Sequence, residues 1–481
     1  MTQKITRTLR QSGREPPMPL ILATPSGELK INTWLRVLPG QRLVGAGDLA
    51  GRPVLVKLFI ARRAERHWQR ETAGLAMLQR AQIATPEVVA SGALDDAGFY
   101  LCTDYLAGAL TLQQSWDALS LRARQSLPAP GDKDAMILLS RALNTIALLH
   151  RAGLTQADLH MGNFLTHNDD LYVIDGDAIK ASCPGHSICA KEAEDNLAIF
   201  FAQLDSSWDV MMEMILIEYL QVNAARALNP DRLLHRVQQV RASRLRDWLA
   251  KSVRDCTHFM VQRNWWQFSS VVREYGPEME AIIVAPDSPF TKAPMLKDGG
   301  SSSVTRVESA GHALIIKRYN IKGLVHWLSR FWRPSRAWHS WLAGHQLHFL
   351  GIATPAPLAM IESRFGWMRR RAWLVTEFCS GPNLLDLLGP DGKSVPTSEQ
   401  SDALLGMLAQ LHQARITHGD FKATNLLWHA EHVWLIDLDS MQFHKAEADY
   451  HRARMKDRAR FVRNWPQGSA LTAWLETHLP Q

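Results

Sequence analysis

An aspartate, an asparagine and a second aspartate recur with one spacing in both halves of the chain. In the first half, Asn163 lies five residues after Asp158, and Asp175 lies twelve residues after Asn163. The second half repeats this spacing with Asp420, Asn425 and Asp437. A loop carboxylate of this kind can orient an acceptor hydroxyl and take its proton, while an amide oxygen and a second carboxylate can hold a metal ion. The repeated spacing therefore predicts phosphoryl transfer from a nucleotide.

A lysine precedes each of these sets, within a strand-like stretch. Lys57 lies in "VLVKLF" (54–59) and Lys317 lies in "LIIKRY" (314–319). Phosphoryl transfer needs such a lysine to hold the α- and β-phosphates. A single Asp-x4-Asn pattern arises by chance in many chains, and its carboxylates are then solvated loop residues. Two copies, each with an upstream lysine and a downstream Ile-Asp, favour two nucleotide sites.

The same series of elements is expected around each set. A strand hairpin comes first, followed by a helix that ends before a Thr-Pro and by more strand. A second helix then ends in Leu-His. It is followed by the loop that carries the Asp-x4-Asn pattern, which we call the repeated loop, and by a last strand. In the first half the hairpin spans 42–59 and the first helix 64–81. In the second half the hairpin spans 303–319 and the first helix 336–351. A β-rich lobe followed by a mainly helical lobe is an α+β fold.

This order divides the chain into two tandem domains. We expect residues 1–25 to be a mobile basic tail and residues 26–283 to be the first domain, with the helical pattern of 192–275 completing its helical lobe. Residues 284–303, rich in Pro, Gly and Ser, are the expected junction and the start of the second domain. The second domain then spans 304–481. Only 44 residues follow its last site aspartate, so its helical lobe is short.

Both halves resemble the bacterial lipopolysaccharide kinase family, the core heptose and Kdo kinases. The motifs that carry the resemblance include "LTQADLHMGNFLTHNDDLYVIDGD", "IKRYNIKG", "LGIATPAPLAMIE" and "ITHGDFKATNLLWHAEHVWLIDLDSM". The resemblance covers most of residues 30–180 and 295–465. It implies two tandem protein-kinase-like domains, each with a β-rich N-lobe and a mainly helical C-lobe. Members of that family transfer the γ-phosphoryl group of ATP to a sugar hydroxyl of the lipopolysaccharide core, at the cytoplasmic face of the inner membrane.

The resemblance also implies roles for single residues. Lys57 and Lys317 match the strand lysine that grips the α- and β-phosphates of ATP, and Glu71 matches the helix glutamate that orients Lys57. By position rather than by resemblance, His160 and Lys422, each two residues after the loop aspartate, are further candidates for phosphate contact. The alternative for His160 is a structural histidine. The remaining matches are the catalytic base, Asp158 and Asp420, and the Mg²⁺ ligands, Asn163, Asp175, Asn425 and Asp437.

Each copy departs from the family pattern at a different place. The first copy has Gln156 and Ala157 where the second keeps the usual His418 and Gly419. The second copy has Ser340 at the position, counted from the shared Ala-Thr-Pro, that holds Glu71 in the first. Lys317 therefore has no obvious carboxylate partner in the sequence.

Composition restricts the partners and the compartment. The net charge of +7 suggests an anionic partner, but no recognised nucleic-acid module accompanies it. Five cysteines without a CxxC pair favour a reducing compartment, and no apolar run is long enough to span a bilayer. We therefore expect a cytoplasmic protein, with possible contact to the inner membrane. Residues 320–341 interleave basic side chains with tryptophans, which suits an anionic glycolipid or membrane surface. The alternative is a helix that packs through its tryptophan face.

Three functions remain open at this stage. The first is an ATP- and Mg²⁺-dependent kinase of a lipopolysaccharide core sugar. The second is a tandem scaffold in which only one domain, or neither, is catalytic. The third is a kinase of another small molecule. A protein substrate is disfavoured because the chain has no GxGxxGxV and no Ala-Pro-Glu motif.

Overall fold

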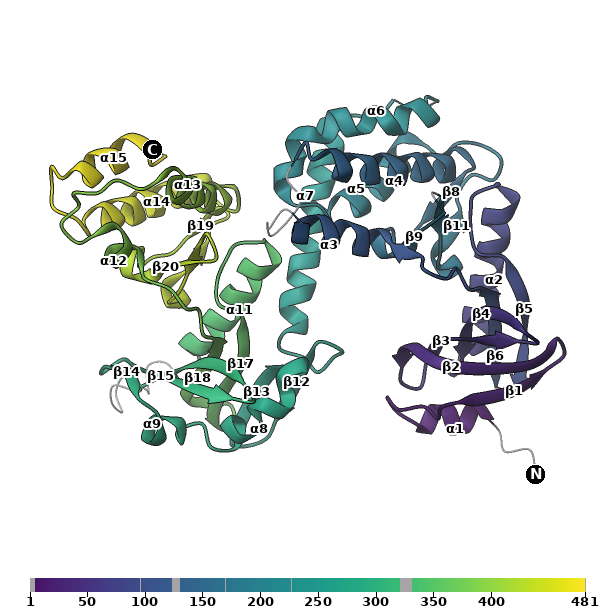
Figure 1. Ribbon diagram of the computed structural model, residues 1–481, viewed down its shortest axis with the longest axis horizontal. Helices are drawn as coiled ribbons and strands as arrows, with labels where there is room; N and C mark the ends of the chain where they lie inside the picture. Colours follow the sequence, from purple (N-terminus) through teal and green to yellow (C-terminus); the bar gives the residue numbers. More distant parts are fainter. Residues whose placement is uncertain are drawn as a thin grey trace. The chain divides into compact units, whose positions relative to one another are not determined.

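The chain folds into two compact units, each built from a sheet and a helical lobe (Figure 1). The computed structural model describes residues 5–95, 97–122, 130–168, 170–225, 227–320 and 331–480. Unit 1 is Met1–Ala242 and unit 2 is Ser243–Gln481. Both units mix helix and sheet, so the α+β fold class is confirmed.

The sheet of unit 1 has six antiparallel strands in the order β1-β2-β3-β4-β6-β5. Along β4 the side chains alternate, so that Val56 and Leu58 are buried while Lys57 faces the other side of the sheet. The alternation therefore presents the lysine away from the apolar core between the sheet and α1. The strands are β1 (Leu20–Thr24), β2 (Gly27–Leu38), β3 (Arg42–Leu49), β4 (Arg52–Phe59), β5 (Val88–Asp95) and β6 (Gly98–Asp104).

The N-terminal segment belongs to this sheet lobe, so the prediction of a mobile tail over residues 1–25 is wrong from residue 5 onward. Helix α1 (Ile5–Gln11) buries Leu9, and β1 pairs with β2 from Leu20 opposite Ile31. Arg10 donates to the carbonyl oxygens of Ile60 and Ala61. The apolar side chains of this basic segment are thus the reason that it is ordered.

Apart from α1, the helices of unit 1 pack around one apolar core. Helix α2 (Ala64–Arg80) follows β4 and packs on β6 and on the single turn η2 (Gly176–Ala178). The other helices are α3 (Leu112–Arg122), α4 (Lys133–Arg151), α5 (Ala190–Phe201), α6 (Met212–Val222) and the first half of α7 (Pro230–Lys251). Short strands flank the repeated loop, namely β7 (Leu110–Thr111), β8 (Leu154–Gln156), β9 (Phe164–His167), β10 (Asp170–Val173) and β11 (Ile179–Ala181).

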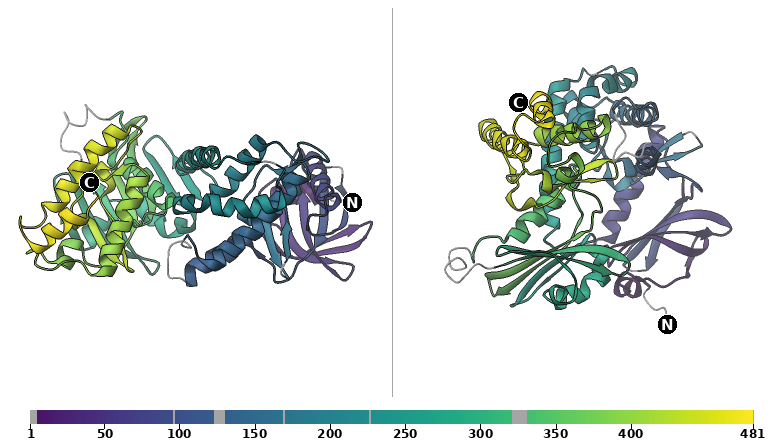
Figure 2. Two further views of the ribbon diagram at one scale, coloured as in Figure 1. Left: turned by 90° about the horizontal axis from the view of Figure 1, so that it is seen from above. Right: turned by 60° about the vertical axis from the view of Figure 1, so that its left-hand side comes forward.

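The sheet of unit 2 has seven antiparallel strands in the order β12-β13-β17-β18-β16-β15-β14, drawn as one twisted sheet in the right-hand view of Figure 2. Helices α8 (Gly276–Val284) and α9 (Pro289–Lys292) lie in the chain between β13 and β14. The strands are β12 (Phe259–Arg263), β13 (Gln267–Val272), β14 (Met295–Asp298), β15 (Ser302–Ser309), β16 (His312–Tyr319), β17 (Pro357–Phe365) and β18 (Met368–Glu377).

The two units meet earlier in the chain than the predicted boundary at residue 283. Strand β13 pairs with β17, for example Ser270 with Met360, so the β12–β13 hairpin belongs to the second sheet rather than to the first helical lobe. The expected junction 284–303 contains β14, which also joins this sheet. Backbone pairing, which composition does not reveal, accounts for both differences.

The helical lobe of unit 2 lies C-terminal to β18. It contains α12 (Leu384–Leu388), α13 (Ser398–Gln413), α14 (Glu447–Val462) and α15 (Ala470–His478), with short strands β19 (Ile416–Thr417), β20 (Leu426–His429), β21 (His432–Leu435) and β22 (Gln442–Phe443). Helix α11 (Arg336–Phe349) packs on β17, β18 and the turn η6 (Leu438–Ser440), as α2 does on η2 in unit 1. Across the described part of the chain, none of the helices has the length and apolarity needed to span a bilayer.

Candidate active site

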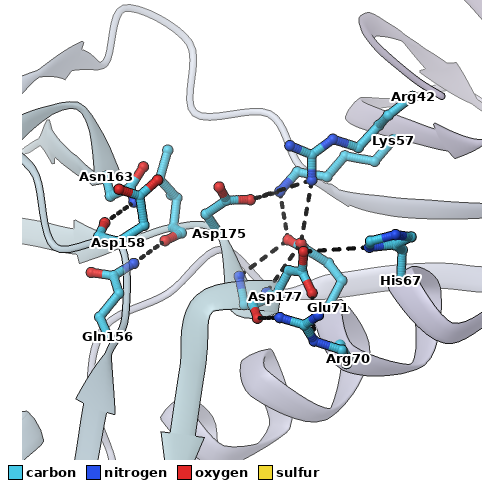
Figure 3. Close-up of polar contacts among 12 residues, drawn as sticks. Arg42, Lys57, His67, Arg70, Glu71, Gln156, Asp158, Asn163, Asp175 and Asp177 are labelled. Atoms are coloured by element: carbon cyan, nitrogen blue, oxygen red, sulfur yellow. Dashed lines mark hydrogen bonds and ion pairs between the residues drawn. The ribbon is translucent and has the colours of Figure 1, made fainter. Parts of the chain in front are cut away.

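In unit 1 the strand lysine forms the predicted ion pair with the helix glutamate (Figure 3). Lys57 Nζ lies 2.5 Å from Glu71 Oε1 and 3.0 Å from Asp175 Oδ1. Burial lowers the pKa of Lys57, but the Glu71 and Asp175 carboxylates outweigh it and raise that pKa above its usual value. The lysine is therefore held as a cation between two carboxylates.

Glu71 joins α2 to the turn that follows Asp175. Its carboxylate also accepts hydrogen bonds from the backbone N–H groups of Gly176 and Asp177, both at 3.2 Å. The helix can approach because Gly74 has no side chain, since a Cβ there would lie 1.9 Å from the Gly176 carbonyl oxygen. Asp175 itself has a left-handed backbone, with φ of 71°. Glycine at position 74 thus allows one carboxylate to hold both the lysine and the turn.

A second cation, from β3, completes the cluster. Arg42 Nη1 lies 3.7 Å from Asp175 Oδ1 and 4.0 Å from Glu71 Oε2. Burial raises the pKa of Asp175, but the charges of Lys57 and Arg42 outweigh it and lower that pKa below its usual value. Asp175 is therefore an anion, as a metal ligand must be. The sequence contained no signal for Arg42.

The repeated loop of unit 1 places Asp158 beside Asn163 but leaves the Asp158 carboxylate exposed to solvent. Asn163 Nδ2 donates to the backbone oxygen of Asp158 at 2.7 Å, which leaves the amide oxygen available. The Asp158 side chain is 69% exposed, with His160 Nε2 at 3.5 Å. Gln156 donates to the backbone oxygen of Ile174 at 2.9 Å (Figure 3). The glutamine thus supports the loop, although it replaces the usual histidine.

In unit 2 the strand lysine has a carboxylate partner that sequence reasoning missed. Lys317 Nζ lies 2.5 Å from Asp437 Oδ1 and 3.0 Å from Asp439 Oδ2. Asp439 lies two residues beyond the predicted metal ligand, in the turn η6. Its counterpart in unit 1 is Asp177, which pairs with Arg70 at 2.9 Å instead. The carboxylate beside the lysine therefore comes from a helix in unit 1 and from a turn in unit 2.

Three side chains hold Asp439 against Lys317. Ser340, which occupies the position of Glu71, donates to Asp439 Oδ1 at 2.9 Å, and the Tyr319 hydroxyl donates to the same oxygen at 2.7 Å. Arg336 Nη1 lies 3.7 Å from Asp439 Oδ2. Burial and the Asp439 charge raise the pKa of Tyr319 well above its usual value, so the tyrosine remains a donor. The serine that departs from the family pattern is thus part of a carboxylate-binding cluster.

The repeated loop of unit 2 holds its aspartate more tightly. Arg460 Nη2, from α14, lies 2.5 Å from Asp420 Oδ1, and Lys422 Nζ lies 3.1 Å from the same oxygen. Asn425 Nδ2 donates to the backbone oxygen of Asp420 at 2.9 Å, which matches the contact in unit 1. The Asp420 side chain is only 27% exposed. Its carboxylate therefore has a defined direction.

A second residue of α14 fixes the backbone of this loop. Asp457 accepts from the N–H of His418 at 2.7 Å and from the N–H of Gly419 at 3.0 Å. The imidazole of His418 contacts the Ile436 backbone oxygen at 2.9 Å, as Gln156 contacts Ile174 in unit 1. Asp457 and Arg460 both lie in "DRAR", near the end of the region of resemblance, but their roles follow only from the contact of α14 with the loop.

The residues present fit ATP and Mg²⁺. In each unit the residue before the candidate metal-ligand aspartate is hydrogen bonded to the asparagine of the repeated loop. The N–H of Ile174 donates to the Asn163 carbonyl oxygen at 2.9 Å, and the N–H of Ile436 donates to the Asn425 carbonyl oxygen at 3.0 Å. Burial raises the pKa of Asp437, but Lys317 outweighs it and lowers that pKa, so this ligand is also an anion. Among the described residues no cluster of three or more His, Cys, Asp or Glu side chains forms a cage for a metal. Mg²⁺ suits such a site because it usually takes one or two carboxylates, with phosphate and water oxygens as the other ligands.

The insert 320–341 is partly a packing element. Trp341 is fully buried and donates to the Ser252 backbone oxygen at 3.1 Å, and Trp338 packs against Phe268 with ring centroids 5.2 Å apart. The prediction of a surface-binding role is therefore wrong for these two tryptophans, because they complete the core under the sheet. Trp332 is exposed. Lys322, His326, Trp327 and Arg330 lie outside the described residues.

Comparison with known proteins supports the family resemblance for unit 2. Residues 292–472 match the model of the lipopolysaccharide kinase (Kdo/WaaP) family. The 3-deoxy-D-manno-octulosonic acid kinase of Xanthomonas campestris pv. campestris (strain B100) is 26% identical over 175 residues, which are 35% of this chain and 68% of the relative. The protein of that name from Xanthomonas euvesicatoria pv. vesicatoria (strain 85-10) is 27% identical over the same length, with the same coverage. The predicted resemblance is thus confirmed for residues 292–472.

Two solved structures show a looser likeness. "WaaP in complex with acyl carrier protein" has a TM-score of 0.33 at 20% identity and covers 44% of this chain and 88% of that chain. "Structure of vaccinia related kinase 3" has a TM-score of 0.29 at 13% identity and covers 54% of this chain and 82% of that chain.

Proposed function

We propose that this chain is an ATP-dependent phosphotransferase that acts on a sugar hydroxyl of the lipopolysaccharide core, and that unit 2 carries the working site. The observation that supports this most directly is the fixed position of Asp420 between Arg460 and Lys422. Asp420 lies inside the segment that matches the lipopolysaccharide kinase family, and the two Xanthomonas relatives described above are 3-deoxy-D-manno-octulosonic acid (Kdo) kinases by name. Heptose and Kdo are both acceptors to test.

In this proposal, each side chain of the unit 2 site has a separate role in the reaction. Lys317 holds the α- and β-phosphates, and Asp437 and Asn425 hold Mg²⁺, which offsets the charge on the transferred phosphoryl group when it is bound. Asp420 orients the sugar hydroxyl and accepts its proton. Arg460 keeps the Asp420 carboxylate in one direction, and Lys422 lies where it can contact the phosphoryl group.

Unit 1 binds nucleotide in this proposal but contributes less to turnover. Its Lys57–Glu71 pair is complete, whereas its Asp158 is largely exposed and lacks a counterpart of Arg460 among the described contacts. A half-catalytic arrangement, in which unit 1 supports unit 2, is therefore the second candidate function. The exposure of Asp158 is the observation that favours it.

The test uses the full chain with ATP and deacylated core oligosaccharides that end in heptose or Kdo. Phosphorylated product is measured by mass spectrometry for the wild type, Asp420→Asn and Asp158→Asn. We expect a loss of about 10²–10⁴-fold for Asp420→Asn, because the general base is removed, and a small change for Asp158→Asn. Equal activity of Asp420→Asn and the wild type would reject the assignment of unit 2. Intact ATP binding without turnover on any core acceptor would reject the substrate class.

A further inference from the structure

Exposed aromatic side chains gather where two hairpins of the unit 2 sheet turn. Trp265 and Trp266 lie in the turn between β12 and β13, and Phe365 and Trp367 lie at the turn between β17 and β18. Trp332 lies shortly before α11. We call these five residues the aromatic patch.

The rings of the aromatic patch form two groups of neighbouring side chains. The Phe365 ring centroid lies 5.9 Å from that of Trp265 and 5.4 Å from that of Trp266. On the other side, the half-buried Phe331 ring lies 5.2 Å from Trp367 and 5.0 Å from Trp332. The two turns are also hydrogen bonded, because the N–H of Gly366 donates to the Trp265 carbonyl at 2.8 Å. The aromatic rings are thus displayed by a hydrogen-bonded scaffold.

Their exposure sets these tryptophans apart from the others. Trp265, Trp266, Trp332 and Trp367 are 60%, 63%, 54% and 69% exposed. Every other tryptophan in the described ranges is buried or half-buried. Exposed apolar surface of this kind, gathered in one place, marks a site of interaction rather than ordinary surface.

Basic residues outnumber acidic ones around the aromatic patch. The segments 259–268, 331–338 and 363–372 contain no aspartate or glutamate. Glu362 lies just outside them, but it is buried and pairs with Arg364 at 2.5 Å. The segments contain seven arginines, Arg263, Arg333, Arg336, Arg364, Arg369, Arg370 and Arg371.

The arginines nearest to solvent complement an anionic surface. Arg263, Arg333 and Arg370 are exposed, and so is Arg371, which pairs with Asp287 at 3.3 Å. Exposed tryptophans beside arginines, without acidic neighbours in these segments, match the interface of an anionic bilayer, where indole rings lie at the level of the headgroups and arginines meet lipid phosphates.

We propose that the aromatic patch docks unit 2 on the surface of an anionic lipid bilayer. The patch is separate from the Lys317 and Asp420 clusters, so this proposal does not depend on the phosphotransferase activity. Binding combines insertion of the tryptophan rings with electrostatic attraction, and salt should therefore weaken it.

The test measures sedimentation of the full chain with vesicles of phosphatidylcholine alone or mixed with phosphatidylglycerol. We expect binding to the mixed vesicles, a blue shift of tryptophan fluorescence, and quenching by brominated acyl chains. Trp265→Ser/Trp367→Ser should weaken binding at least about tenfold, because two apolar rings no longer enter the interface. The matched control is Val284→Ser/Val395→Ser, which removes two exposed apolar side chains of the same unit outside the patch and should bind as the wild type does.

A charge variant tests the electrostatic attraction to the anionic lipid without removing any aromatic ring. Arg263→Gln/Arg333→Gln/Arg370→Gln should also weaken binding at least about tenfold. The matched control is Lys30→Gln/Arg80→Gln/Lys191→Gln, which lowers the net charge equally at exposed positions of unit 1. Circular dichroism verifies the fold of each variant.

Four outcomes would overturn the proposal. They are absence of wild-type binding, equal binding to neutral and anionic vesicles, unchanged binding of the folded patch variants, and loss of binding in the control variants as well. Patch-dependent self-association in sedimentation velocity without vesicle binding would instead assign the aromatic patch to a second copy of the chain.

Discussion

The hydroxyl of Ser340 donates a hydrogen bond to the carboxylate of Asp439 at 2.9 Å. Asp439 in turn lies 3.0 Å from Lys317, which has no glutamate on α11 to pair with. In unit 1 the corresponding helix position is Glu71, and this glutamate contacts Lys57 directly. The two units thus place a carboxylate beside the corresponding strand lysine from different elements, a helix in unit 1 and a turn in unit 2.

Asp439→Asn should impair the proposed reaction in unit 2. It removes one of the two carboxylates beside Lys317, and a hydrogen bond to a charged group contributes about 1.5–3 kcal/mol. We expect kcat/KM for ATP to fall roughly 10- to 100-fold. Steady-state kinetics with varied ATP and saturating acceptor measures the change.

A double variant separates positioning from general damage. Ser340→Glu/Asp439→Asn places a carboxylate on the helix, as in unit 1, and should restore part of the lost kcat/KM. The comparison variant is Asp177→Asn, which removes the partner of Arg70 and should have a smaller effect. If Asp439→Asn has wild-type kinetics, Asp439 does not position Lys317.

Glutamine should be tolerated in place of His418. Gln156 makes the equivalent contact in unit 1, to the carbonyl of Ile174, so its side chain has the required reach. We expect His418→Gln to keep most of the activity. His418→Ala should lose roughly 2- to 10-fold, because a hydrogen bond of about 0.5–1.5 kcal/mol is removed. Initial rates at saturating substrates distinguish the two, and equal losses would show that the imidazole has another role.

Adding a methyl group at Gly74 should destabilise unit 1. The Cβ of alanine would lie 1.9 Å from the Gly176 carbonyl oxygen, so α2 must shift away from the turn that Glu71 binds. We expect Gly74→Ala to lower the free energy of unfolding by about 1–3 kcal/mol in urea titrations. The control is Gly406→Ala in α13, where a Cβ meets nothing within 4 Å. Gly406→Ala should raise the free energy of unfolding by about 1 kcal/mol. A lower free energy of unfolding in both variants would count against the steric explanation.

Stability should fall in acid because of a buried histidine in unit 2. Burial, together with repulsion from His348, lowers the pKa of His345 to about 3, whereas the unfolded side chain titrates near 6.5. Between these values the unfolded state binds the proton and the folded state does not. The free energy of unfolding therefore decreases as the pH falls from about 6.5 towards 3, by up to about 1.4 kcal/mol per pH unit.

The variant His345→Phe isolates this effect. Phenylalanine keeps the ring contacts with Phe259 and Trp341 but cannot bind a proton. Thermal unfolding of the variant between pH 4 and 7 should depend less on pH than that of the wild type. If the unfolding temperatures of the variant and the wild type change equally with pH, His345 does not contribute to the pH dependence of stability.

The repeated Asp–Asn–Asp spacing could be recognised from the sequence alone. The spacing of Asp158, Asn163 and Asp175 is local, and a loop between a helix and a strand needs only those few residues to form. The hairpins around Lys57 and Lys317 follow from alternation of apolar side chains, and the structure confirms them. Residue types at short range thus determined the order of elements and the main candidate residues.

Only the tertiary structure decided which partners these residues have. Asp439 reaches Lys317 across more than a hundred residues of chain, and Arg460 reaches Asp420 because α14 packs beside the repeated loop. The β12–β13 hairpin joined the second sheet because a strand pairs with whichever edge is adjacent in space. Single-sequence patterns record local preferences, whereas ion pairs and strand neighbours depend on distances that the whole fold sets.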